Sequence, residues 1–293
     1  MAEEADKNQG CMKVVFPENS QGFCFGVKRA IDIVLHEAKE GSVDVIGYLV
    51  HNPEVIANLS KRGVRVIAGV SELTAQKVAI TAHGAPRGLY EQLPEKQLID
   101  ATCPYVKRLQ KTVDELDKDG YQVVILGDLS HPEVISVCSY ARNPIVISGV
   151  EEAESLGVLG KVALVCQTTQ NTKTFDSVVK ALKARNPDIE VVNTICPSTT
   201  IRQNNASDMK GSVGAVVIVG GKMSANTKRL VELVSDGGLK AFWIEEASEL
   251  TQELLFEVKT LVESHRSCSI GLLSGASTPL ETVLEVKNIL ENT

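Results

Sequence analysis

The sequence repeats one pattern of buried strands and helices, and this repetition constrains the fold more than any other feature. Eight runs rich in Val and Ile recur along the chain, at residues 43–50, 64–68, 77–81, 121–127, 144–148, 161–166, 214–221 and 268–274. Segments with the periodicity of amphipathic helices lie between these runs. Continuous apolar runs are typical of strands that are covered on both faces. The alternation therefore predicts an α/β protein with largely parallel sheets.

Three copies of this pattern can be aligned, each beginning with a cysteine at the start of a helix. The three cysteines are Cys24, Cys103 and Cys196. After each cysteine come a helix, a strand, a polar loop and a second helix, and then a later strand that ends in a loop of small residues. The polar loops contain His51, His131 and Asn226, which follow their cysteines by 27, 28 and 30 residues. The copies predict three similar α/β domains in a pseudo-threefold arrangement.

The repetition also predicts one shared site. In parallel α/β units, ligands bind at the carboxyl ends of the strands, so three units around an axis would direct six polar loops at one centre. The expected domains are residues 13–103, 104–196 and 197–281, with a flexible N-terminus at residues 1–12 and a C-terminal segment at residues 282–293. The alternative is that three similar layers share no site and that the histidines only cap strands.

The residues around the aligned cysteines favour metal binding. Pro104 and Pro197 disfavour a helical conformation of the preceding residue and fit the first helical position, so Cys103 and Cys196 are predicted N-cap residues. The positive end of a helix lowers the pKa of a thiol and favours the thiolate that binds metals. Three thiolates could hold zinc together with a histidine, or an iron–sulfur cluster with one open iron. The remaining cysteines are expected to be small buried hydrophobic residues, namely Cys11, Cys138, Cys166 and Cys268.

The loops that follow the strands supply the side chains of an anion site. They contain His51, His83, His131, Glu133, Thr168, Thr169, Ser224, Asn226 and Ser277. Imidazolium, hydroxyl and backbone N–H groups suit a phosphate or diphosphate. The chain has neither a GxxxxGK[ST] nor a GxGxxG motif, so a nucleotide loop of either kind is excluded. The other two histidines, His36 and His265, are expected on the surface.

Charge and hydrophobicity exclude several classes of protein. The formal net charge is -7 and no Lys/Arg-rich run occurs, which argues against nucleic acid as a partner. No apolar stretch approaches the roughly 20 residues that span a bilayer, and the N-terminus resembles no export signal, so no membrane association is expected. Seven scattered cysteines do not resemble a disulfide framework. We therefore expect a reducing compartment, the cytoplasm.

A series of short motifs gives the chain a specific resemblance to a known family. In order, they are GFCFGVKRAI, VHNPEV, AHGAP, DATCP, HPEV, QTT, ICPSTTIRQ, KMSANTKRL and SGASTP. In this combination the chain resembles the 4-hydroxy-3-methylbut-2-enyl diphosphate reductase family, from about Gly22 to about Leu280.

The resemblance implies a trefoil-like fold around a 4Fe-4S cluster and assigns roles to residues. The cluster would be held by Cys24, Cys103 and Cys196, and its fourth iron would be open to the substrate. The diphosphate would be bound by His51, His83, His131, Thr168, Ser224, Ala225, Asn226 and Ser277. Glu133 and Thr168 would be catalytic, with Glu133 delivering protons through the Thr168 hydroxyl. The reaction would remove the allylic hydroxyl reductively and give isopentenyl or dimethylallyl diphosphate, the last step of the non-mevalonate pathway.

The resemblance also implies an electron donor such as a ferredoxin or a flavodoxin. Two positions depart from the family pattern. Ala225 stands where a second serine is common, so any contact there must use its backbone N–H, and the HPEVIS segment lacks a glycine that is common after this motif.

Two other functions are compatible with the same cysteines. One is a non-catalytic iron–sulfur or zinc sensor that binds a diphosphate, and the other is a zinc hydrolase with an activated water.

Overall fold

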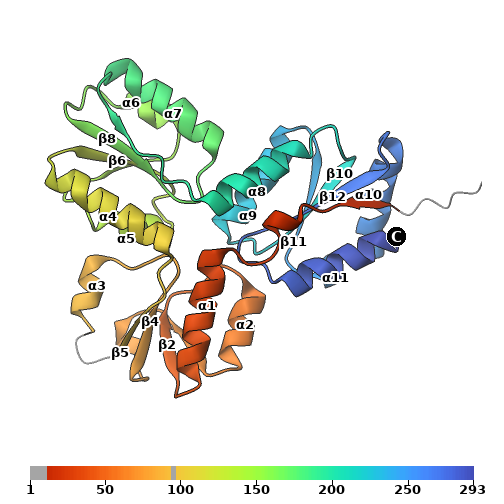
Figure 1. Cartoon of the computed structure of the whole chain (residues 1–293), viewed down its shortest axis with the longest axis horizontal. Coiled ribbons are helices and arrows are strands. Elements are labelled where there is room, and N and C mark those ends of the chain that lie inside the picture. Colours follow the sequence, from red (N-terminus) through yellow and green to blue (C-terminus); the bar gives the residue numbers. More distant parts are fainter. Residues whose placement is uncertain (1–11, 94–96) are drawn as a thin grey trace, which may run out of the picture.

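Three α/β domains surround the centre of the molecule, each built on a parallel four-stranded sheet (Figure 1). The structure is a computed structural model and describes residues 12–93 and 97–293. The predicted fold class, three similar α/β domains in a pseudo-threefold arrangement, is confirmed. Of the predicted flexible N-terminus, residues 1–11 lie outside the described residues, whereas Met12 is buried in the core of the third domain.

The first domain contains a sheet in the order β3-β2-β4-β5. Its strands are β2 (Val43–Ile46), β3 (Val64–Ile67), β4 (Lys77–Ile80) and β5 (Gln97–Asp100). Its helices are α1 (Phe25–Ala38), α2 (Pro53–Ser60), the short η2 (Val70–Glu72) and α3 (Arg87–Glu91). The four residues of β4 are all buried, as expected for a strand covered on both faces.

The second domain repeats this arrangement with the order β7-β6-β8-β9. Its strands are β6 (Gln122–Leu126), β7 (Ile145–Ile147), β8 (Val162–Cys166) and β9 (Glu190–Val191). Its helices are α4 (Pro104–Lys118), α5 (Pro132–Cys138), α6 (Val150–Ser155) and α7 (Thr172–Arg185). Two hydrophobic clusters cover the two faces of this sheet.

The third sheet has the order β1-β12-β10-β11 and takes its first strand from the N-terminal part of the chain. Its strands are β1 (Lys13–Val15), β10 (Ala215–Val219), β11 (Lys240–Ile244) and β12 (Ser269–Ser274). Around it lie η1 (Glu18–Ser20), α8 (Pro197–Asp208), α9 (Ala225–Asp236), η3 (Ala247–Glu249), α10 (Gln252–Ser264) and α11 (Leu280–Glu291).

This sheet corrects the domain boundaries at both ends of the chain. The sequence predicts that residues 13–23 belong to the first domain, but Lys13 of β1 pairs in parallel with Ser269 of β12. We also set residues 282–293 apart, but Val283, Val286 and Leu290 of α11 belong to the buried core of the third domain. The third domain therefore contains both ends of the described chain. β1 forms the edge of the sheet beside β12, and α11 packs against one face of the sheet.

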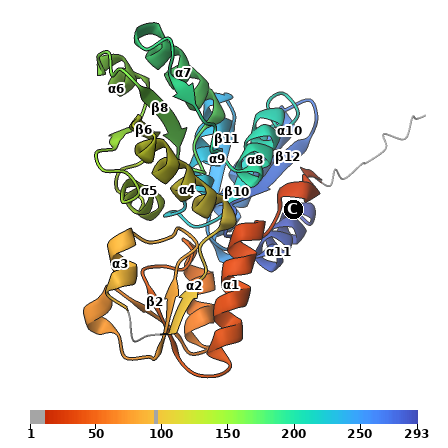
Figure 2. The same cartoon turned by 60° about the vertical axis from the view of Figure 1, so that its left-hand side comes forward.

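In each sheet, one of the two edge strands is followed along the chain by a cysteine. β5 is followed by Cys103, β9 by Cys196 and β1, after η1, by Cys24. Each cysteine then begins the long helix of the next domain, which is α4, α8 or α1. Because the chain crosses between domains at these three points, all three cysteines lie near the centre, where the three helices begin (Figures 1 and 2).

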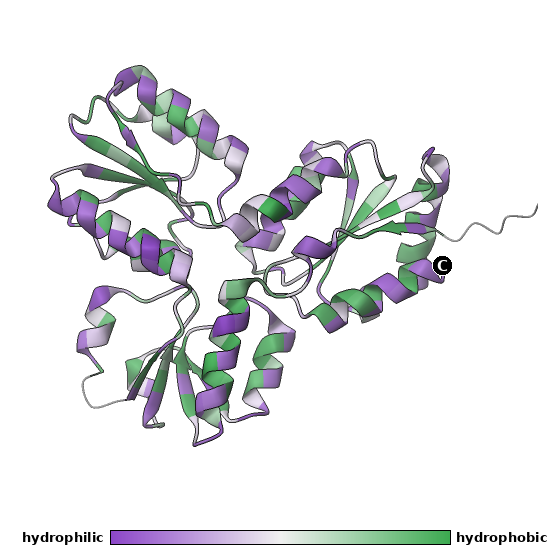
Figure 3. Ribbon diagram, viewed as in Figure 1, coloured by the Kyte–Doolittle hydropathy of each residue, from purple (hydrophilic) through white to green (hydrophobic). Residues whose placement is uncertain are grey.

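Hydropathy explains why the central strands lie inside the domains, and backbone conformation explains where one of them ends. The strands are largely hydrophobic, and the helices alternate between hydrophobic and hydrophilic faces (Figure 3). The predicted strand at residues 43–50 is shorter in the structure, because Gly47 has a φ of 80°, a left-handed conformation that ends β2 after Ile46. The strands β1, β5, β9 and β11 were not predicted; β1 and β9 are only three and two residues long, and β5 begins and ends with a polar residue.

Candidate functional site

A single cavity at the centre is lined by every site residue that the sequence predicted. These residues are Cys24, His51, His83, Cys103, His131, Glu133, Thr168, Thr169, Cys196, Ser224, Ala225, Asn226 and Ser277. They come from all three domains and from loops that follow parallel strands, which is where such folds place ligands. The two histidines expected on the surface are not in this cavity: His36 is exposed and His265 is partly exposed at the end of α10.

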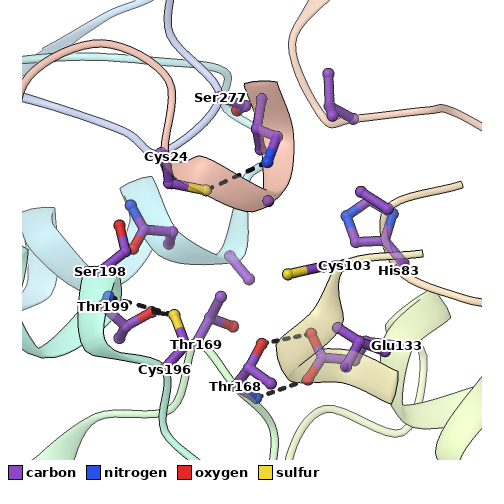
Figure 4. Close-up of a pocket in the computed structure, with 18 of the residues that line it drawn as sticks. Cys24, His83, Cys103, Glu133, Thr168, Thr169, Cys196, Ser198, Thr199 and Ser277 are labelled. Carbon is purple, nitrogen blue, oxygen red and sulfur yellow. Dashed lines mark hydrogen bonds between the residues drawn. The ribbon is translucent and has the colours of Figure 1, made fainter. Parts of the chain in front are cut away.

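Each of the three cysteines is the N-cap residue of its helix, as predicted for Cys103 and Cys196. Their sulfur atoms are directed into the cavity (Figure 4). The Cys24 sulfur accepts a hydrogen bond from the Val27 N–H at 3.5 Å, and the Cys196 sulfur accepts one from the Thr199 N–H at 3.4 Å. The free N–H groups of these helix starts therefore point at the sulfurs and favour their negatively charged form.

Burial of the Cys103 and Cys196 thiols raises their pKa values more than the helix starts lower them. Desolvation raises the pKa of Cys103 to about 11, and the backbone N–H groups of its helix lower it only in part. Desolvation also raises the pKa of Cys196. The expectation that the helix starts lower the thiol pKa values is thus wrong for Cys103 and Cys196. A bound metal replaces the thiol protons, so metal binding here must release protons.

The close approach of two helix starts depends on a glycine. A Cβ atom added to Gly26 of α1 would lie 2.4 Å from the Cys103 sulfur, which begins α4. Real Cβ atoms do not approach a neighbour so closely, so any larger residue must displace the Cys103 side chain. Gly26 is part of the GFCFGV motif, and its role in positioning a second cysteine becomes visible only in three dimensions.

Arg202 of α8 connects the segments that hold two of the cysteines. It is buried, and its guanidinium donates hydrogen bonds to the carbonyl oxygens of Gly22 at 2.6 Å and Ser274 at 3.3 Å. These carbonyls lie just before Cys24 and at the end of β12. The positive charge also lies close enough to Cys24 and Cys196 to interact with them. A buried cation beside these two thiols helps to compensate the charge that they gain when they bind a metal.

Three histidines form a compact group in the cavity. The ring centroids of His51 and His83 are 4.4 Å apart, and those of His83 and His131 are 5.3 Å apart. One nitrogen of each ring lies within 4.8 Å of the others, which would also suit a cation. Desolvation lowers the pKa of His131 to about 4 and holds that of His83 well below its usual range. Burial therefore favours the neutral form of these imidazoles, whereas the sequence predicts imidazolium groups for an anion site.

Two buried polar atoms of this cavity have no hydrogen-bond partner among the described residues. They are the Nδ1 atom of His83 and the Nδ2 atom of Asn226. The Nδ1 atom of His131, by contrast, accepts a hydrogen bond from the Glu133 N–H at 3.1 Å, so its Nε2 atom carries the proton. Because buried polar groups are almost always paired, the two orphaned atoms indicate that a polar ligand completes this site.

The Glu133 carboxyl group also lines the cavity, and among the described residues its hydrogen bonds are to Thr168 alone. It accepts one hydrogen bond from the Thr168 N–H at 2.6 Å and another from the Thr168 hydroxyl at 2.8 Å (Figure 4). Desolvation raises the pKa of Glu133 to about 7, although both hydrogen bonds act in the other direction. The group can therefore hold or release a proton near neutral pH.

The third domain supplies hydroxyl, amide and backbone groups. Ser224 is the N-cap residue of α9, and Ala225 and Asn226 form its first turn, so the free N–H groups of this helix start face the cavity. The Ser277 hydroxyl donates a hydrogen bond to the His51 carbonyl at 3.3 Å and connects the third domain to the first. A helix start with adjacent hydroxyl groups is a favourable site for a phosphate group.

The structure revises the alignment of the repeats. Asn52, His131 and Ser224 are the N-cap residues of the corresponding helices α2, α5 and α9. Each follows its cysteine by 28 residues, so these three positions correspond, whereas the sequence pattern predicts that His51 and Asn226 correspond to His131. Helix capping is a better marker of the repeat than residue type.

The sequence reasoning missed several neighbours of the sulfurs. Tyr105, Ser198 and Thr199 also line the cavity, from the first helical turns after Cys103 and Cys196. Their position two or three residues after a cysteine was a usable signal, because the first turn of a helix surrounds its N-cap. Among the other cysteines, Cys166 is buried and Cys138 partly buried, but Cys268 is exposed in the turn before β12, contrary to expectation. Cys11 lies outside the described residues.

Known proteins resemble this chain in sequence and in fold along nearly its whole length. The family model described as LytB protein matches residues 15–291. The 4-hydroxy-3-methylbut-2-enyl diphosphate reductase of Geobacter sulfurreducens is 38% identical over 94% of this chain and 95% of its own length. That of Geotalea daltonii is 37% identical over 96% and 98%.

Two solved structures have the same fold. The E-1-hydroxy-2-methyl-but-2-enyl-4-diphosphate reductase of Plasmodium falciparum superposes with a TM-score of 0.86 at 28% identity, over 96% of this chain and 88% of that chain. A second (E)-4-hydroxy-3-methyl-but-2-enyl diphosphate reductase, described as the terminal enzyme of the non-mevalonate pathway, superposes at 0.65 with 35% identity, over 96% and 100%. No helix among the described residues is long and apolar enough to cross a membrane.

Proposed function

This chain belongs to the LytB family, and we propose on that premise that it is a 4-hydroxy-3-methylbut-2-enyl diphosphate reductase. The reaction removes the allylic hydroxyl of the substrate as water and yields isopentenyl or dimethylallyl diphosphate, with the uptake of two electrons and two protons. It is the last step of the non-mevalonate isoprenoid pathway. The observation that most supports this function is the convergence of three cysteines and one proton-bearing carboxyl group in a single cavity.

The three thiols fit a 4Fe-4S cluster as the cofactor. Cys24, Cys103 and Cys196 would hold it, because sulfur ligands select iron–sulfur clusters or zinc and three of them leave one iron open. The buried charge of Arg202 and the helix starts that face the sulfurs support a cofactor that carries negative charge. When bound, such a cluster supplies electrons and a Lewis-acidic iron for cleavage of the carbon–oxygen bond.

The histidine side of the cavity and the start of α9 would bind the diphosphate. Neutral imidazoles donate from one nitrogen each, and a bound anion raises their pKa values and brings in protons. Ser224, Asn226 and Ser277 add hydroxyl and amide donors, and Ala225 adds its backbone N–H. The unpaired Nδ1 atom of His83 and Nδ2 atom of Asn226 would find their partners in this ligand.

Glu133 would supply protons through Thr168. The Thr168 hydroxyl donates to the Glu133 carboxyl at 2.8 Å and lines the same cavity, so it can pass a proton toward the departing oxygen. With a pKa of about 7, Glu133 carries its proton in roughly half of the molecules at neutral pH. The residues that would act chemically are therefore Glu133 and Thr168, and the others would bind and orient.

The described cysteines are all free thiols, which supports a reducing compartment, and we place the protein in the cytoplasm. The electrons would come from a ferredoxin or a flavodoxin.

Purification under strict exclusion of air tests the cofactor and the function together. We expect about four irons and four sulfides per chain and reduction of the diphosphate substrate. The Glu133→Gln variant should retain the cluster and bind substrate, while turnover falls at least about a hundredfold. Stoichiometric zinc would favour a hydrolase instead, and an iron–sulfur protein that binds the diphosphate without reducing it would be a sensor.

A further inference from the structure

A buried hydroxyl group joins the first domain to the second. Ser136 of α5 is buried and does not line the central cavity itself. Its hydroxyl accepts a hydrogen bond from the Gln110 side-chain amide of α4 at 2.7 Å and donates one to the Ala85 carbonyl at 3.0 Å. Gln110 and Ser136 belong to the second domain, whereas Ala85 belongs to the first. These hydrogen bonds therefore cross the domain boundary and use the hydroxyl both as acceptor and as donor.

The two hydrogen bonds fasten the His83 loop, which we define as residues 81–85 and which follows β4. Gly84 lies between His83 and Ala85 and has a φ of 80°, a left-handed conformation that favours glycine. A Cβ atom added to Gly84 would lie 2.5 Å from the Gln110 side-chain nitrogen and 2.9 Å from the Ser136 hydroxyl oxygen. The loop is therefore packed directly against the two side chains that hold it.

The His83 ring depends on this loop for its position. Its buried Nδ1 atom has no partner among the described residues, and its ring neighbours are the imidazoles of His51 and His131. The His83 backbone N–H donates to the Thr81 hydroxyl at 3.3 Å, which is a contact within the loop. Because no hydrogen bond to Nδ1 holds the ring, a displacement of the loop backbone displaces the imidazole in the cavity.

Arg87 adds a second, more exposed contact between the same domains. Its backbone N–H donates to the Ser139 hydroxyl at 3.0 Å. Its guanidinium pairs with Asp114 and lies 4.4 Å from the centre of the Tyr140 ring. The Arg87 side chain is 47% exposed, so solvent and salt screen this ion pair. The Ser136 hydroxyl is enclosed, and removing it leaves two buried partners unpaired, so it contributes more to holding the loop.

We propose that Ser136 is a positioning residue, which fastens the His83 loop to the second domain and thereby sets the affinity of the cavity for diphosphate. This role rests on the proposed function, because His83 is one of the residues that would bind the diphosphate. Glu133 lies three residues before Ser136 in α5, and His83 and Glu133 both line the cavity (Figure 4). Ser136 therefore connects the helix that carries Glu133 with a loop of the anion site.

The sequence explains why this contact is a property of the present chain. Ser136 ends the HPEVIS segment, which lacks a glycine that is common after this motif. A glycine at position 136 has no hydroxyl and could form neither hydrogen bond.

Ser136→Ala tests the positioning role in the cluster-loaded protein. The matched control is Ser20→Ala in η1, because the Ser20 hydroxyl is also part of a buried residue and makes the same kinds of hydrogen bond. It accepts from the Asn205 side-chain amide at 2.7 Å and donates to the Pro17 carbonyl at 3.3 Å. Ser20 lies in the third domain and does not line the cavity. Both variants lose a hydroxyl with two partners, but only Ser136→Ala releases the His83 loop.

Three measurements are compared: hydrogen–deuterium exchange of residues 82–90, the dissociation constant for inorganic diphosphate, and KM and kcat for the substrate. We expect residues 82–90 of Ser136→Ala to exchange about tenfold faster and the variant to bind diphosphate about tenfold more weakly. KM should rise by a similar factor, while kcat stays within about twofold, since Glu133 and Thr168 are unaltered. Ser20→Ala should be destabilised toward urea to a similar extent but leave all three measurements unchanged.

A double-mutant cycle with His83→Ala separates positioning from a general loss of stability. Because Ser136 acts through His83, adding Ser136→Ala to His83→Ala should weaken diphosphate binding by less than about twofold. Gln110→Met removes the donor to the same hydroxyl and should shift the three measurements in the same direction, so it tests the role even where Ser136→Ala does not fold.

Unchanged exchange of residues 82–90, unchanged diphosphate binding, or an undiminished effect of Ser136→Ala in the His83→Ala background would overturn the positioning role. Unchanged diphosphate binding in His83→Ala alone would instead refute the proposed diphosphate site, and the exchange rates would still show whether Ser136 fastens the loop.

Discussion

Glu133→Gln should stabilise the protein at alkaline pH while it removes activity. The pKa of Glu133 rises from 4.5 to about 7 because the carboxyl group is completely buried. A carboxyl with a raised pKa binds its proton more tightly in the folded state. Its stabilising contribution is therefore complete below pH 4.5 and is lost as the pH rises through 7. A shift of about 2.5 units at about 1.4 kcal/mol per unit amounts to a loss of about 3 kcal/mol at pH 8.

The variant avoids this loss because glutamine stays neutral. Its carbonyl can still accept from the Thr168 N–H, and its amide can donate to the Thr168 hydroxyl oxygen, so both hydrogen bonds are retained. We expect its free energy of unfolding to be close to that of the unaltered protein below pH 4.5 and to exceed it by up to about 3 kcal/mol at pH 8. Urea denaturation of the metal-free proteins, at steps of half a pH unit, measures this difference directly.

Glu54 provides the control, because it occupies the corresponding position in α2 but is exposed and accepts a hydrogen bond from Thr282. The Glu54→Gln variant should follow the unaltered protein at every pH. A stability difference for Glu133→Gln that does not grow between pH 5 and pH 8 would refute the buried, neutral carboxyl and with it the assignment of Glu133 as proton donor.

Three further predictions concern the cysteines, the histidines and the buried arginine. Gly26→Ala should displace the Cys103 side chain, cost about 1–3 kcal/mol and sharply lower the iron content, whereas Gly88→Ala, which has open space around it, should leave the iron content unchanged. Binding of inorganic diphosphate near pH 7 should take up protons, because burial lowers the pKa of the cavity histidines; the binding heat should therefore vary with the ionisation enthalpy of the buffer, and affinity should fall as the pH rises. Arg202→Met should destabilise the protein by about 2–4 kcal/mol, measured by urea denaturation, because two carbonyl groups lose their buried donor; a loss below about 0.5 kcal/mol would contradict this role.

The sequence predicted those features that depend on local patterns. Continuous apolar runs identified the central strands, since a strand covered on both faces has few other compositions. Proline after Cys103 and Cys196 identified two helix starts, because the ring restricts the preceding residue. The loop residues of the cavity were also predictable, because loops after parallel strands converge on one side of each sheet, whereas Tyr105, Ser198 and Thr199 in the first helical turns were missed.

Features that depend on burial or on distant partners could not be predicted in this way. The pairing of β1 with β12 joins two ends of the chain, and nothing local to Lys13–Val15 indicates its neighbour. The thiol pKa values depend on a balance between helix start and desolvation, and only the depth of the cavity decides it. The contact between Gly26 and Cys103 likewise exists only after two domains have come together.

The two corresponding loops at residues 52–55 and 131–134 show most clearly what local sequence determines and what the tertiary structure decides. The sequence alone determined that residues 52–55 and 131–134 each begin a helix with a proline at its first position and a glutamate at its second. Only the tertiary structure decided that Glu54 faces solvent and Thr282, whereas Glu133 is enclosed beside Thr168. The reason is physical: local sequence fixes backbone conformation, but the loss of water around a carboxyl group, which sets its pKa, depends on the residues that the rest of the fold packs against it.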